Sequence, residues 1–156
     1  MPEHLAALSG EVVDLEQSYE VAGFKMHAIE VPHDPDIQSL SWRIETGDAS
    51  AVVSGDLKVN AGFMVPFTVD ADLLVHEAYS EPGLDALVKG MPTEIAREGA
   101  KRNFEPTHSE VSAVAKIAQA AGVSRLALTH FVPAEDDVRQ HRKRTFRWRG
   151  VCRHRR

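Results

Sequence analysis

The sequence contains one cysteine, Cys152, among its 156 residues. A single cysteine excludes a framework of intrachain disulfide bonds and favours a reducing, cytoplasmic compartment. The chain also lacks a run of about 18 apolar residues, so we expect no membrane span. Its first residues, Met1-Pro2-Glu3-His4, do not combine a basic region with an apolar one, and we expect no signal peptide.

Acidic residues are missing after residue 138, and basic residues are scarce before it. Residues 139–156 hold nine of the 18 Lys and Arg residues, whereas residues 1–138 hold nine basic and all 23 acidic residues, a formal charge of −14. Such an acidic body disfavours a broad nucleic-acid-binding surface. We therefore predict one folded domain over residues 1–138 and a basic, disordered tail over residues 139–156.

Alternating apolar residues predict several strands in the first half of the chain. We expect strands over Gly10–Leu15 and Phe24–Val31, with His33 in the proline-containing loop that follows. The segments Ser39–Glu45 and Ala49–Ser54 then flank a turn and predict a β-hairpin.

Helices and short apolar strands follow in the second half. Residues 57–70 are ambiguous and allow a short helix before Pro66, and Ala71–Val75 predicts a strand. Two further helices are expected, from Pro82 to Gly90 and from Pro92 to about Arg102.

The segment from Thr107 to His130 predicts a helix, a tight stop and a buried strand. Thr107 and Glu110 match a capping box, and apolar residues then recur at helical spacing as far as Gly122, where a helix favours a left-handed residue. Leu126–Leu128 forms the predicted strand, and His130 stands at its carboxyl end. Because ligand sites open at the carboxyl ends of such strands, His108 and His130 are expected to face one pocket.

Three predicted strands end in groups that can bind a metal or titrate: Asp56, His76-Glu77 and His130. Carboxylates and imidazoles are ligands that zinc or manganese accepts, and a bound metal lowers the pKa of its water toward about 7. The residues alone also allow these groups a purely structural role without a metal, because an Asp after Gly commonly forms a turn.

Four segments occur in the order found in the metallo-β-lactamase superfamily, and the chain most resembles ribonuclease Z and the neighbouring arylsulfatase-like hydrolases. These segments are Ser54-Gly55-Asp56, Ala71–Tyr79, Thr107-His108-Ser109 and Leu128–Phe131. The resemblance covers roughly residues 24–133. It implies an α/β fold, namely the C-terminal half of a four-layer αββα sandwich with a mixed sheet and flanking helices.

The resemblance also implies roles for four residues. Asp56 would bridge two metal ions, and His130 would be the late metal-binding histidine. His108 would handle a proton, with Glu77 orienting it. The implied cofactor is zinc in a two-metal site, with manganese as the alternative. The implied substrate is a phosphodiester, such as the 3′ end of a tRNA precursor, or a sulfate or other ester.

Opposed effects are expected on the pKa of His108. A position in the first turn of a helix would lower it through the helix dipole, and the carboxylate of Glu77 would raise it. A pKa near neutrality suits a general acid that protonates a leaving oxygen.

The sequence departs from the family pattern in two respects. It contains no His-x-His-x-Asp-His motif, so this chain would not fully bind the metals alone, and Tyr79 replaces a Thr of the family. A lone half-sandwich would also leave an apolar sheet face uncovered. Three interpretations stay open: a hydrolase completed by another chain or in a homodimer, an inactive fragment, and an interaction module whose basic tail binds RNA.

Overall fold

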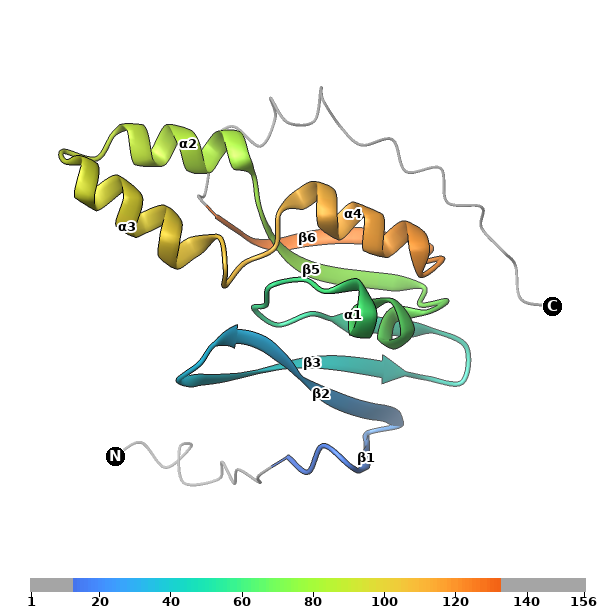
Figure 1. Cartoon of the computed structure of the whole chain (residues 1–156). Coiled ribbons are helices and arrows are strands. Elements are labelled where there is room, and N and C mark those ends of the chain that lie inside the picture. Colours follow the sequence, from blue (N-terminus) through green and yellow to red (C-terminus); the bar gives the residue numbers. More distant parts are fainter. Residues whose placement is uncertain (1–12, 133–156) are drawn as a thin grey trace, which may run out of the picture.

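A computed structural model of the chain describes residues 13–132 (Figure 1). The predicted tail over residues 139–156 lies outside the described residues. Within these residues, six strands form one sheet and stand in the order of the sequence. They are β1 (Ser18–Val21), β2 (Phe24–Asp34), β3 (Ile37–Glu45), β4 (Ser50–Val53), β5 (Leu73–Tyr79) and β6 (Leu126–Val132).

The direction of the strands changes within the sheet. Strands β1 to β4 pair antiparallel, and the predicted hairpin is confirmed as β3–β4, where Trp42 pairs with Val53. Strands β4, β5 and β6 run parallel, because helices carry the chain back between them. The carboxyl ends of these three strands therefore meet at one edge of the sheet, which is where the predicted site residues stand.

Between residues 13 and 132, four helices accompany the sheet: α1 (Ala61–Thr68), α2 (Glu81–Lys89), α3 (Glu94–Phe104) and α4 (Val111–Ala120). Helices α1 and α4 lie against the sheet, and α2 and α3 form a pair that extends from the carboxyl end of β5 (Figure 1). The main core joins buried Val52 and Leu74 to Ala118 of α4, with Val65 of α1 packed against it. None of the described helices is long and apolar enough to span a bilayer.

The opposite sheet face is also apolar. Trp42 pairs with Val53, and Val53 pairs with Val75, so these three side chains form a row across neighbouring strands. Val53 is 37% exposed. The core clusters formed by the described residues pack on the side of α1 and α4 and around α2 and α3, and the apolar row joins none of them.

Several predicted boundaries differ from the structure. Residues 13–15 are not in a strand, whereas β2 continues through His33, which was expected in a loop. Pro66 lies inside α1 and does not follow it. The segment expected to be a buried strand is β6, an edge strand in which Leu128 is 42% exposed, because only β5 pairs with it.

The start of α4 also differs from the predicted capping box. The N-cap is Glu110, whose side chain accepts from the amides of Ser112 and Ala113. The hydroxyl of Thr107 instead donates to carbonyl oxygens in the last turn of α3. The predicted helix stop is confirmed, since Gly122 has a φ of +69° after the C-cap.

Candidate active site

Asp56 lies in the loop that follows β4, and a glycine sets its position. Gly55 has a φ of +65°, and a Cβ atom at this position would collide with the carbonyl oxygen of Leu40 in β3. Only glycine adopts this conformation against a neighbouring backbone without strain. The tight turn therefore brings Asp56 to the carboxyl edge of the parallel strands.

His130 approaches Asp56 from β6. Its Nε2 atom lies 3.5 Å from Oδ2 of Asp56, and both side chains are partly exposed. His130 has a φ of +43°, an uncommon conformation for a residue other than glycine, and the register between β5 and β6 shifts beyond Glu77. The irregular part of β6 is therefore the part that carries His130, the residue that lies next to Asp56.

Glu77 and His108 form a second pair beside the first. Oε2 of Glu77 lies 3.3 Å from Nδ1 of His108, and Oε1 accepts from the backbone amide of Ser109 at 2.8 Å. Glu77 is only 1% exposed. Burial raises its pKa from 4.5 to about 7, although bonds from Ser109 act in the opposite direction.

Rings surround His108. Phe104 stacks on it with 4.4 Å between ring centroids, and the rings of His33 and His130 lie 5.3 and 5.9 Å away. Burial lowers the pKa of His108, while the negative charge of Asp56 raises it. The helix-dipole explanation was wrong, because His108 precedes the N-cap of α4 by two residues.

His33 joins this cluster from the end of β2, although the sequence pattern predicted it in a loop. Its Nδ1–H donates to the carbonyl oxygen of Thr107 at 2.9 Å, which leaves the lone pair on Nε2. The signal that could have placed it is the alternation of β2, in which Ile29, Val31 and His33 share a face. The two prolines around it obscured that pattern.

His76 does not join the cluster. His76 and Glu77 are consecutive residues of β5, so the side chain of His76 points to the sheet face opposite to that of Glu77, where it is completely buried. Its Nδ1–H donates to the carbonyl oxygen of Glu77, and its Nε2 has no hydrogen-bond partner among the described residues. Burial lowers the pKa of His76.

The donor set for a metal is incomplete within the described residues. Asp56 and His130 offer an oxygen and a nitrogen near one point, but no three His, Cys, Asp or Glu side chains between residues 13 and 132 are placed to hold a metal ion. Zinc usually takes four ligands. These residues alone therefore do not fit a complete zinc site.

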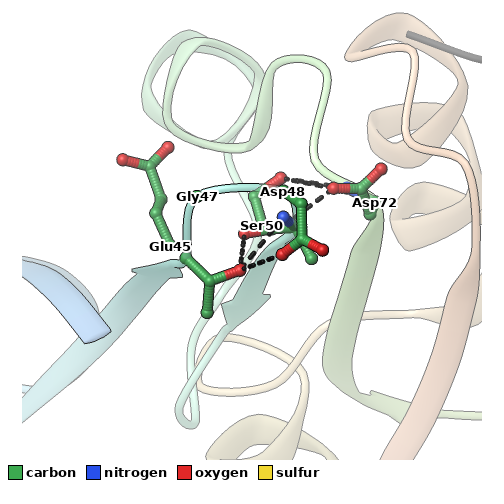
Figure 2. Close-up of a pocket in the computed structure, with 7 residues that line it drawn as sticks. Glu45, Gly47, Asp48, Ser50 and Asp72 are labelled. Carbon is green, nitrogen blue, oxygen red and sulfur yellow. Dashed lines mark hydrogen bonds between the residues drawn. The ribbon is translucent and has the colours of Figure 1, made fainter. Parts of the chain in front are cut away.

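A separate hollow of about 200 Å³ lies at the turn between β3 and β4 (Figure 2). It stands at the amino ends of β4 and β5, away from the histidine cluster at their carboxyl ends. The carboxylate of Asp72 accepts from the amide and the hydroxyl of Ser50, and the hydroxyl of Thr46 donates to Asp48. The polar groups of this hollow thus stabilise the turn.

Comparison with known proteins identifies relatives of one kind, although no protein-family model matches the chain. Ribonuclease Z of Mycobacterium tuberculosis is 31% identical over 112 residues, 72% of this chain, and ribonuclease Z of a Mycobacterium species is 32% identical over 111 residues. The chain spans less than half of the length of these relatives, 37% of the first and 35% of the second.

Solved structures agree with these sequence relatives. The metallo-β-lactamase fold protein YhfI from Bacillus subtilis matches 88% of this chain and 49% of its own, with a TM-score of 0.63 and 21% identity. The short form of human tRNase Z matches 74% of this chain and 40% of its own, with a TM-score of 0.52 and 26% identity. Together with the fold, these relatives show that this chain belongs to the metallo-β-lactamase superfamily, on its ribonuclease Z-like branch, and that it spans part of that fold.

Proposed function

We propose that this chain forms part of a metal-dependent phosphodiesterase of the ribonuclease Z type. The observation that supports this proposal is the placement of the Asp56–His130 pair beside the Glu77–His108 pair at one edge of the sheet. Relatives named ribonuclease Z and the similarity to human tRNase Z favour RNA, in particular a tRNA precursor, over a sulfate ester.

Each of the four residues has a proposed task. His108, half enclosed by rings, protonates the leaving oxygen, and Glu77 fixes the orientation of its imidazole through Nδ1. Asp56 and His130 contribute two donors to a metal centre, for which zinc and then manganese are our proposed ions.

The remaining metal donors come from outside the described residues in this proposal. A second copy of the chain or a further segment of the protein could supply them. We place the enzyme in the cytoplasm on the evidence of its single cysteine.

Hydrolysis of bis(p-nitrophenyl) phosphate tests the proposed function. The chain alone and the longest open reading frame that contains it are assayed with zinc or manganese, and bound metal is measured. We expect metal-dependent turnover that Asp56→Ala abolishes and that His108→Ala lowers by about 100-fold or more. Turnover that is unchanged in both variants would contradict the proposal.

A further inference from the structure

Ser109 bonds Glu77 and the loop that follows Asp56 through different atoms. It is completely buried. Its backbone N–H donates to Oε1 of Glu77 at 2.8 Å, and its carbonyl oxygen accepts from the amide of Tyr79 at 2.9 Å. These bonds need no side chain, so they hold residues 108 and 109 against the end of β5 whatever residue stands at position 109.

The hydroxyl of Ser109 instead reaches the loop that carries Asp56. It donates to the carbonyl oxygen of Leu57 at 2.6 Å and accepts from the amide of Val59 at 2.9 Å. Leu57 follows Asp56 directly and is itself completely buried. One hydroxyl therefore satisfies two backbone groups in the loop that follows Asp56.

We propose that Ser109 is a positioning residue that keeps the loop of Asp56 in place relative to the Glu77–His108 pair. This inference rests on the proposed hydrolytic function. Alanine at position 109 would retain the amide bond to Glu77 and would remove both bonds to the loop. The carbonyl oxygen of Leu57 and the amide of Val59 would then lose their partner inside the protein, which drives the loop to shift toward water. A displacement of about 1 Å in a catalytic group can cost about 100-fold in rate.

The role predicts a specific pattern in double variants. In the active enzyme that contains this chain, Ser109→Ala should lower kcat at least tenfold and leave KM within about twofold, because substrate binding elsewhere is intact. Turnover in an Asp56→Asn background is expected to be too low to compare, so the second background must retain the Asp56 carboxylate. In a His108→Ala background Ser109→Ala should still cause its full loss.

The matched control removes a buried hydroxyl far from the site. Thr68 is completely buried, and its hydroxyl donates to the carbonyl oxygen of Met64 within α1. Thr68→Val should lower thermal stability without changing kcat. Hydrogen exchange of the Val59 amide should accelerate at least tenfold in Ser109→Ala, while the amide of residue 109, still bonded to Glu77, keeps its protection.

The outcomes separate the two proposals. A wild-type enzyme that hydrolyses no phosphodiester overturns the proposed function and, with it, the role of Ser109. An active wild-type enzyme in which Ser109→Ala has normal kcat overturns the role of Ser109 alone. The same holds if Ser109→Ala and the control Thr68→Val lower kcat by the same factor, because a general loss of folded protein would act in that way.

Discussion

The isosteric substitution Glu77→Gln should stabilise the protein at alkaline pH and not at acidic pH. The carboxyl of Glu77 is 1% exposed, and burial raises its pKa from 4.5 to about 7. In the unfolded chain this carboxyl loses its proton near pH 4.5, whereas in the folded protein it keeps the proton up to about pH 7. The unfolded state is therefore favoured progressively as the pH rises through this window.

The pKa values give the magnitude of the effect. Each pKa unit corresponds to about 1.4 kcal/mol, so the full change between pH 4.5 and pH 7 costs the wild-type protein about 3 kcal/mol of stability. Gln cannot ionise and still presents an oxygen to the amide of Ser109. The stability difference between Glu77→Gln and wild type should thus grow from near zero at pH 4.5 to about 3 kcal/mol above pH 7.

Urea unfolding of both proteins at a series of pH values measures this difference. Glu98→Gln, which changes an exposed carboxylate on α3, is the control and should show no such trend. Equal stability of Glu77→Gln and wild type at pH 8 would refute the argument from burial. A variant less stable than wild type at pH 8 would show that Glu77 is held as a charged partner.

Three further predictions concern neighbouring residues. Gly55→Ala should lower the free energy of unfolding by about 2 kcal/mol or more in urea, because φ is +65° and a Cβ would meet the carbonyl oxygen of Leu40. The control Gly99→Ala, in open space on α3, should be neutral or stabilising. Equal effects of the two substitutions would contradict this argument. Burial lowers the pKa of His76, so the free energy of unfolding should fall as the pH drops below 6.5. In His76→Leu this fall between pH 6.5 and pH 5 should be shallower. Parallel curves of stability against pH for the two proteins would contradict the prediction. Phosphodiester turnover in His108→Ala should fall by about 100-fold, a larger loss than that of folded protein. Equal losses of turnover and folded protein would indicate a structural role.

Local patterns in the sequence predicted much of the fold and the meeting of the site residues. Alternation around a Gly-containing turn predicted the β3–β4 hairpin, which the register confirms. The placement of Asp56, Glu77 and His130 after apolar strands predicted a common edge, and the structure brings these side chains together with His108. Their catalytic roles stay predictions.

Two other features were not predictable from local patterns. The cap of α4 depends on competition between two capping residues, and the exposure of β6 depends on the position of that strand in the sheet. Thr107 and Glu110 can both cap a helix, and only the packing of the preceding turn on α3 decides that Glu110 does so. The composition of β6 resembles that of a buried strand, but its exposure follows from its place at the edge of the sheet. His33 was obscured because prolines lengthened the apparent loop.

The row of apolar side chains on the sheet face away from α1 and α4 contains a tryptophan whose fluorescence depends on whether that face is exposed to water. Trp42 is one of two tryptophans in the chain, and it pairs with half-exposed Val53 in the middle of that face. In a Trp148→Phe protein its fluorescence would be the sole indole signal. Emission at long wavelength would then indicate a wet surface, and a blue shift would reveal when another layer of protein covers it.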